Sequence, residues 1–331
     1  MTWDRRSFVT GLGVAVLASA CKRATPTSHT DELTPPNPGD PIDPGFHSVG
    51  RSPLVADGEG WIELGDGVVI RRDAKLAETG RIAIEGGRSV AVLADRSLIV
   101  CATSAGSRIA NHVAGNAIAS SHASTADWVL PTESADAYWA VGSRWIDRVA
   151  IGGTATRQYP LPENSYPFSA AVTSDHRVVI ANLYGILRTD PELATFAWEN
   201  PPSHLGAGPD ASLVWASLNP WKNGPAHVAL VKLDGAAASA IAKHALPAGE
   251  AIVHFSGNGA VAVATTARSL APSRAAFSLV AYDSKGERWR VALGEDSQGY
   301  YTAMSATRVV VLAKPSNALR SWDLATGKET S

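Results

Sequence analysis

Four stretches of this chain repeat one pattern, in which small or apolar residues lead into a polar pair that is followed by three or more apolar residues. Such a pattern is typical of two short β-strands joined by a tight turn. The four copies are "SVAVLADRSLIVCA" (89–102), "SAAVTSDHRVVIA" (169–181), "AIVHFSGNGAVAVA" (251–264) and "YTAMSATRVVVLA" (301–313). The expected turn pairs are Asp95-Arg96, Asp175-His176, Asn258-Gly259 and Ala306-Thr307. Among them, Asn-Gly favours a type I′ turn, in which both turn positions need positive φ.

A second, more polar hairpin follows each copy after a variable loop. The clearest are "SLVAYDSKGERWRVAL" (278–293) and "ALRSWDLATGKE" (318–329). Weaker ones begin near Val68, Arg108, Trp145, Ile186 and Val228. The starts lie roughly 37 to 51 residues apart, close to the period of about 40 to 45 residues of a four-stranded propeller blade.

These repeats predict an all-β fold, a single β-propeller of about seven four-stranded blades, with six or eight as alternatives. No amphipathic stretch after the N-terminal segment is long enough to predict a helix. The chain has 331 residues, of which 45% are hydrophobic, so a sizeable core is possible. Trp198, Trp289 and Trp322 fall on second hairpins, where blades widen and larger side chains fit between neighbours.

The last hairpin, in "RSWDLATGKETS" (320–331), is expected to have a strand and a turn but no full second strand. An exposed strand edge favours unwanted pairing with other chains. We therefore expect the segment "GFHSVG" (45–50), just before the first blade, to supply the outer strand and close the ring.

Two of the second hairpins, "AYDSKGERW" (281–289) and "SWDLATGKE" (321–329), resemble the repeat of quinoprotein-like propellers. In that repeat, a strand ending in Asp is followed by a Thr-Gly-Lys-type turn and a strand with tryptophan. Trp322-Asp323 also matches the dipeptide of the WD repeat, although the Gly-His that accompanies it there is missing.

The quinoprotein resemblance raises the question of a quinone cofactor. In the dehydrogenases of that family, a disulfide between adjacent cysteines, a calcium site and an eight-blade ring support the cofactor. This chain has two cysteines, Cys21 and Cys101, which are not adjacent, and about seven blades. We therefore expect no cofactor.

The first 21 residues are typical of an export signal. A polar start with Arg5 and Arg6 leads into an apolar run (8–20) of about 13 residues, shorter than the ~20 that a membrane-spanning helix needs. "DRRSF" (4–8), with Arg5, Arg6 and Phe8, resembles the twin-arginine motif, which implies export of a folded protein.

The same segment ends in "ASAC" (18–21), which resembles the lipobox of bacterial lipoproteins. The resemblance implies that Cys21 carries a lipid and becomes the new N-terminus; simple cleavage after Ala20 is the alternative. Residues 22–44 are rich in Pro, Thr, Ser and Asp, a composition that predicts a flexible tether. The expected organisation is therefore signal (1–21), tether (22–44) and propeller (45–331), in a protein of the bacterial envelope, periplasmic or at the cell surface, held by a lipid anchor.

The charges and the reactive residues exclude several classes of function. A net charge of −2 argues against a nucleic-acid partner, since neutralising phosphates needs a basic excess. The sequence contains neither an H-E-x-x-H nor a G-x-S-x-G motif, so no metal site or catalytic group is predicted. Cys101 is expected to be a buried, unreactive thiol. The aspartates at second-hairpin turns are expected to bind turn backbone, with calcium ligation as the lesser alternative: Asp190, Asp234, Asp283 and Asp323.

Among the nine histidines, His254 is the candidate channel residue, because it falls in an expected inner strand. His112 and His122 lie across an expected loop. Core packing is the alternative interpretation for His254.

Three stretches punctuated by Gly and Pro are expected to be long loops: 200–210, 219–227 and 265–277. Loops on a rigid scaffold often carry binding residues. In the second stretch, Trp221 beside Lys222 is a candidate anchor for a partner, with packing between blades as the alternative.

The sequence thus favours a non-catalytic, membrane-tethered propeller that binds an envelope protein or another macromolecule through its loops. The alternative is a propeller enzyme that uses the central channel, either a quinoprotein-like oxidoreductase or a metal-dependent hydrolase. Binding of a small sugar or peptide is a third possibility.

Overall fold

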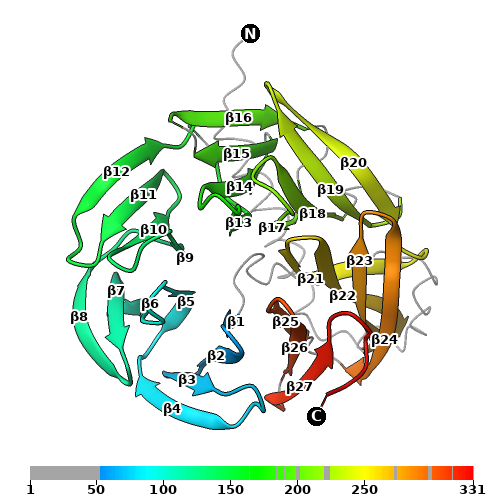
Figure 1. Ribbon diagram of the computed structural model, residues 1–331, viewed down its shortest axis with the longest axis horizontal. Coiled ribbons are helices and arrows are strands. Elements are labelled where there is room, and N and C mark those ends of the chain that lie inside the picture. Colours follow the sequence, from blue (N-terminus) through cyan, green and yellow to red (C-terminus); the bar gives the residue numbers. More distant parts are fainter. Residues whose placement is uncertain are drawn as a thin grey trace, which may run out of the picture. The chain divides into compact units, whose positions relative to one another are not determined.

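The computed structural model describes residues 53–163, 165–183, 185–189, 191–198, 202–219, 224–271, 274–296, 300–314 and 316–330. Every element of secondary structure assigned in these ranges is a β-strand, and the strands are numbered β1 to β27. They form seven antiparallel blades that follow one another around a ring (Figure 1). The predicted all-β propeller and its seven blades are therefore confirmed. Within the described ranges, no helix is long and apolar enough to cross a membrane.

Each blade begins at the ring axis and ends at the outside. The first three blades are β1 (Leu54–Asp57), β2 (Gly60–Gly65), β3 (Val68–Arg72) and β4 (Glu78–Ala83); β5 (Gly87–Val92), β6 (Leu98–Ser104), β7 (Ser107–Ala114) and β8 (Ala117–Ala123); and β9 (Trp128–Pro131), β10 (Ala137–Val141), β11 (Trp145–Ala150) and β12 (Ala155–Pro160).

The fourth and fifth blades are β13 (Ser169–Val172), β14 (Val178–Asn182), β15 (Gly185–Thr189) and β16 (Leu193–Ala197); and β17 (His204–Ala207), β18 (Leu213–Leu218), β19 (His227–Asp234) and β20 (Ala237–Ala245). A single parallel pair, Ala197 with Ala237, links the outer strands of these two blades. The sixth and seventh are β21 (Glu250–Asn258), β22 (Val261–Ala271), β23 (Arg274–Asp283) and β24 (Gly286–Asp296); and β25 (Tyr300–Met304), β26 (Arg308–Ala313) and β27 (Ala318–Asp323).

The repeated patterns of the sequence correspond to fixed places in the blades. The four first hairpins are the inner pairs β5–β6, β13–β14, β21–β22 and β25–β26. The expected starts of the second hairpins fall within one residue of the third strand in six blades, and β23 begins earlier, at Arg274. A polar pair followed by a run of apolar residues made these hairpins visible, because their second strands are buried on both faces, as the continuous burial of β6, β14 and β26 shows.

The turn of the inner hairpin in the sixth blade differs from the prediction. Asn258 pairs with Val261 as the last residue of β21, so that Gly259 and Ala260 form the two-residue loop. Gly259 has φ of 64°. Ala260, the second loop residue, is not among the residues with positive φ. A type I′ turn needs positive φ at both positions and a type II′ turn only at the first, so the predicted type I′ turn is wrong.

Two of the three expected loops contain strands. Stretch 200–210 includes β17, the inner strand of the fifth blade, and stretch 265–277 is the paired end of β22 and β23. The Gly and Pro residues misled the prediction, because a four-residue strand such as β17 has little room to show alternation. In the remaining stretch, 219–227, residues 220–223 lie outside the described residues.

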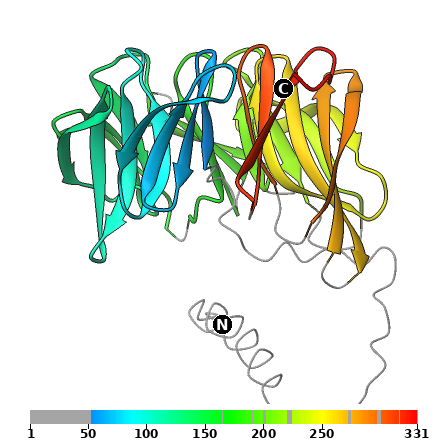
Figure 2. The same ribbon diagram turned by 90° about the horizontal axis from the view of Figure 1, so that it is seen from below.

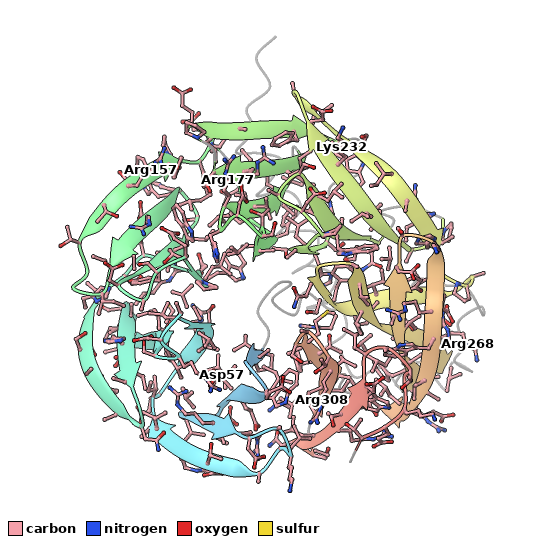
Figure 3. The ribbon with its side chains drawn as sticks, in the orientation of Figure 1. Asp57, Arg157, Arg177, Lys232, Arg268 and Arg308 are labelled. Atoms are coloured by element: carbon pink, nitrogen blue, oxygen red, sulfur yellow. The ribbon has the colours of Figure 1, made fainter. Side chains whose placement is uncertain are left out.

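The ring closes between the first and last blades. Leu54 and Trp61 pack against Val310 and Leu312, and all four side chains are buried. Figure 3 labels Asp57 on the first blade and Arg308 on the last. The Arg308 guanidinium donates to the carbonyl of Ala74 in the first blade, which adds a polar contact to this apolar interface.

The outer side of β27 is partly covered by the chain's own last residues. Glu329 forms a bridge with Trp322, and the Thr330 N–H donates to the Ser321 carbonyl at 2.8 Å. These residues occupy the beginning of the place where the other blades have a fourth strand. The segment 45–50, which we expected there, lies outside the described residues.

Tryptophans tie neighbouring blades together. The indole Nε1 atoms of Trp139 and Trp215, on inner hairpins, donate to turn carbonyls of the following blade at 3.1 and 2.9 Å. Trp289 does the same from β24, to Leu324 at 2.9 Å. Of the tryptophans expected on second hairpins, Trp198 directly follows β16, Trp289 lies on β24 and Trp322 lies on β27, but the expectation omits the tryptophans of the inner hairpins. The inner strands lie close together at the axis. Side chains on them that face a neighbouring blade enter the space between blades, where an indole ring fits.

The two ends of the ring carry different connections (Figure 2). We call one end the entry rim. It carries the connections between the second and third strands of each blade (β2–β3, β6–β7, β10–β11, β14–β15, β18–β19, β22–β23 and β26–β27) and the links between blades. The other end, the turn rim, carries the connections between first and second strands and between third and fourth strands. In Figure 2 the long strands of the sixth blade extend downward at the entry rim.

Candidate functional site

The inner strands surround a cavity of about 350 Å³ along the ring axis. Small apolar and hydroxyl side chains form much of its wall, because inner strands approach one another closely. Its described lining includes no Asp, Glu, Lys or Arg. The titratable residues that line it are His204 and His254. Any chemistry in this cavity would therefore depend on these two imidazoles.

His254, the channel candidate of the sequence, lies in β21 and is 7% exposed. Its Nδ1 lies 2.8 Å from the Thr302 hydroxyl of the next inner strand and accepts the Thr302 N–H at 3.2 Å. A nitrogen that accepts an amide hydrogen bond carries no proton, so the neutral ring has its proton on Nε2.

Two serines in other blades make the same kind of contact as His254. Ser89 Oγ accepts the Val129 N–H at 3.1 Å, and Ser169 Oγ accepts the Leu205 N–H at 3.0 Å. In each case an inner-strand side chain satisfies an amide of the following blade, which would otherwise be buried without a partner. His254 therefore has a structural role in this ring, as a joint between the sixth and seventh blades.

His204 is the cavity residue that sequence reasoning missed. It begins β17 and is 5% exposed, and its Nδ1 lies 2.8 Å from Ser217 Oγ on β18. The rings of His204 and His254 lie 6.2 Å apart between centroids, with planes at 52°. Blade spacing was the signal available for it, since an inner strand must begin roughly one blade length before β21.

Both imidazoles are neutral at neutral pH. Burial lowers the pKa of His254 to about 4. Burial, together with the neighbouring His254, lowers the pKa of His204 to about 3. A general base works best with a pKa near the operating pH, so neither ring is suited to proton transfer near pH 7.

Other titratable side chains serve as local contacts. His112 and His122 lie on β7 and β8, on either side of the turn that joins these strands, and His122 Nε2 lies 2.7 Å from the Tyr138 hydroxyl of the next blade. Among the described residues, no three His, Cys, Asp or Glu side chains are placed to hold a metal ion. The Oδ1 atoms of Asp283 and Asp323 accept N–H groups of their own turns, as expected.

Cys101 is completely buried in β6, where its Sγ lies 3.2 Å from the Ala126 carbonyl. It is thus enclosed by the second and third blades. A thiol in such surroundings packs like a small apolar residue.

A second cleft, of about 410 Å³, opens at the turn rim of the first blade. The Asp57 carboxylate, 7% exposed, pairs there with Arg71 at 3.2 Å and with Arg96 of the second blade at 2.9 Å. Arg71 also donates to the carbonyls of Gly115 and Arg96. These ion pairs and hydrogen bonds join the first two blades.

Large apolar side chains are exposed mainly at the entry rim. Trp145, Tyr166 and Leu183 are 39, 56 and 47% exposed and come from the third blade, the link after it and the fourth blade. Leu270, on the long β22, is 45% exposed. β18 ends and β19 begins at this same rim.

Several residues singled out in the sequence lie outside the described residues. They are Arg5, Arg6, Phe8, Cys21, Asp190, Trp221 and Lys222. Export, lipidation and the binding role of Trp221 and Lys222 therefore stay predictions. Sequence reasoning missed Trp145, Tyr166 and Leu183, whose common signal is an apolar residue at a connection expected to be polar.

No protein-family model matches this sequence, and no curated protein matches it. Solved structures do resemble it. The β-propeller domain of Myceliophteria thermophila Cps50 (Swd1) is 11% identical, with a TM-score of 0.63 over 82% of this chain and 97% of that one. The WD40 domain of Neurospora crassa Pan2 is 13% identical, with a TM-score of 0.53 over 72% of this chain and 76% of that one.

An enzyme is also among the similar structures. Virginiamycin B lyase from Staphylococcus aureus is 11% identical, with a TM-score of 0.56 over 80% of this chain and 92% of that one. Identities this low show a shared propeller fold and nothing about activity. Propellers that bind other macromolecules and propellers that catalyse reactions share this architecture, so function has to be argued from the residues of this chain.

Proposed function

We propose that this chain is an exported, lipid-anchored and non-catalytic propeller that binds an envelope partner, a protein or another macromolecular surface, through the loops of its entry rim. The observation that carries the proposal is the exposure of Trp145, Tyr166 and Leu183 at that rim, where they come from the third blade, the link after it and the fourth blade. Exposed apolar residues that cluster mark interaction sites, and Trp and Tyr are enriched among the residues that anchor partners.

The axial cavity supports the same choice over an enzyme. Its two histidines are used as hydrogen-bonding partners of neighbouring strands, and burial keeps both neutral. A catalytic imidazole needs a free nitrogen aimed at a substrate and a pKa near the working pH. His254 meets neither requirement at Nδ1.

Partner binding can be tested with a matched pair of variants. In one, Trp145, Tyr166 and Leu183 are each replaced by Ser. In the control, Ile118 and Ile241, which are 45 and 54% exposed on the outer strands β8 and β20, are replaced by Ser. We expect an envelope partner that co-purifies with the native chain to be lost with the first variant and kept with the second. Equal recovery with both variants would refute binding at the rim.

Anchoring is tested separately by cell fractionation. Cys21→Ser should move the chain from the membrane fraction to the soluble fraction, because a lipid chain supplies the attachment. Replacing Arg5 and Arg6 by Lys should reduce export, which would be measured as precursor retained inside the cell. A membrane fraction unchanged by Cys21→Ser would contradict lipidation.

A further inference from the structure

We infer that the surface met by the entry rim is the lipid–water interface of the membrane to which the chain is tethered. This inference rests on the proposed function and names the partner of the same rim. It commits to a bilayer as the occupant, and a protein partner becomes an outcome of the test.

The exposed side chains suit such an interface. Tryptophan and tyrosine combine an apolar ring with a polar group and are enriched where membranes meet water. Trp145 and Tyr166 are of this kind, and Leu183 and Leu270 offer purely apolar surface. Immersing such side chains to a shallow depth stabilises attachment in proportion to the apolar area that leaves water.

Their distribution fits a broad, flat partner. Trp145, Tyr166 and Leu183 belong to the third and fourth blades, whereas Leu270 belongs to the sixth. Figure 1 shows these blades on different sides of the ring. A single peptide in a groove would need its contacts in one sector, but a bilayer can meet all of them at once.

Contacts of the backbone and of neighbouring residues hold the segments that carry these side chains. Trp145 begins β11 opposite Pro160. The residues beside Tyr166 and Leu183 are tied together, since Asn182 Nδ2 donates to Ser165 Oγ at 2.6 Å and both side chains are buried. Ordering these residues therefore costs little additional entropy on binding.

The chain also enters the propeller at this rim. Pro53, the first described residue, accepts the Leu64 N–H with its carbonyl at 2.6 Å, next to the β2–β3 connection. The 52 preceding residues contain the predicted tether and Cys21, so the tether is joined to the propeller at the rim that carries Trp145 and Tyr166. Tethering raises the effective concentration of this rim at the membrane, so that weak contacts suffice.

Exposed charges at the rim have both signs, and we expect binding to depend little on salt or on anionic lipid. The positive residues are Arg88, Arg144 and Arg268, and the negative residues are Asp66, Glu85 and Glu163. Figure 3 shows Arg268 on the sixth blade.

The test is hydrogen exchange of the full chain, alone and with vesicles of phosphatidylcholine, with and without phosphatidylglycerol. We expect amides at 143–146, 166–168 and 182–183 to exchange several-fold more slowly with vesicles, while amides at 95–97 and 175–177 on the turn rim stay unchanged. The variant that combines Trp145→Ser, Tyr166→Ser and Leu183→Ser should lose this protection. The control variant with Ile118→Ser and Ile241→Ser should keep it. Unchanged vesicle-free exchange on the turn rim shows that each variant is folded.

Two results would overturn the inference. In one, vesicles leave amide exchange at the entry rim unchanged; in the other, vesicles slow it equally in both variants. If a purified envelope protein then protects the same amides, the proposed function stands and only the bilayer is excluded. If neither lipid nor the envelope partner protects the rim, both proposals fail.

Discussion

At the scale of single residues, some buried side chains that line the axis make the same contact with different residue types. Ser89, Ser169 and His254 each accept an amide hydrogen of the next inner strand. A buried N–H without a partner costs about 1 to 3 kcal/mol, which explains a polar side chain in an otherwise apolar wall. Serine or histidine can fill this role, so the residue type alone does not reveal it.

The two buried histidines predict that stability falls in mild acid. Their pKa values of about 3 and about 4 in the folded chain lie below the ordinary 6.5. Below pH 6.5 the unfolded chain therefore binds protons that the folded chain refuses, and the free energy of unfolding falls by about 1.4 kcal/mol per pH unit for each histidine. The loss continues until the pH reaches the folded pKa values.

Urea unfolding at pH 7 and pH 5 measures this loss. A variant with His204→Gln and His254→Gln should lose most of the pH dependence, because glutamine can accept the same hydrogen bonds without titrating. Equal stability of the native chain at both pH values would show that the histidines are not held neutral.

At the scale of strands and blades, the contacts between neighbours matter most. A blade is built by local hairpins, but it is held to the next blade by a few polar contacts and by apolar packing. The indole bonds of Trp139, Trp215 and Trp289 recur at three such interfaces. Each combines a large buried area with one satisfied donor.

Asp57→Asn should loosen the interface between the first and second blades. The substitution leaves Arg71, which is largely buried, without its charged partner, and we expect a loss of about 3 kcal/mol in the free energy of unfolding. Chemical denaturation measures it. Glu78→Gln, in an exposed pair with Arg81, is the control and should change the midpoint much less. Similar effects of both substitutions would argue against the structural role of Asp57.

Gly206→Ala should disturb the contact between the inner strands β17 and β21. A Cβ atom at Gly206 would lie 2.4 Å from the Gly257 backbone nitrogen, so the strands would have to separate. Overpacking of this kind costs about 1 to 3 kcal/mol. Thermal unfolding should show a clear decrease in Tm, whereas Gly152→Ala, with no atom within 4 Å of its Cβ, should be nearly neutral. An unchanged Tm for Gly206→Ala would contradict this packing.

At the scale of the whole molecule, the ring is closed by apolar contacts between the first and last blades. Leu54 and Trp61 meet Val310 and Leu312 there. These residues are about 250 positions apart in the chain, and contacts of this separation are slow to form and entropically costly. Closure therefore depends on the earlier blades having formed the correct curvature.

Removing residues 328–331 tests what covers the outer edge of the last blade. The truncation removes the Thr330 and Lys328 hydrogen bonds to β27 and the Arg320–Glu329 ion pair. We expect it to lower Tm more than deletion of 43–50 does. The opposite order of Tm values would favour the N-terminal segment as the closing strand.

Much of the fold was predictable from the sequence, because hairpins are local. The positions of β5–β6, β13–β14, β21–β22 and β25–β26 follow from a polar turn pair and the apolar run after it, all within about 14 positions. The short strand β17 was missed, since four residues between Pro and Gly carry too little pattern. The candidate site was predictable only in part: His254 was placed at the axis, and His204 was not.

The sequence by itself determined that the chain forms repeated β-hairpins of blade length, and therefore a propeller, because backbone preference and alternation act between near neighbours. Only the tertiary structure decided which residues meet across blades. It brought His204 beside His254, Asp57 beside Arg96, and Trp145, Tyr166 and Leu183 to one rim. The physical reason is that such contacts depend on the register and curvature of the whole ring, to which every blade contributes.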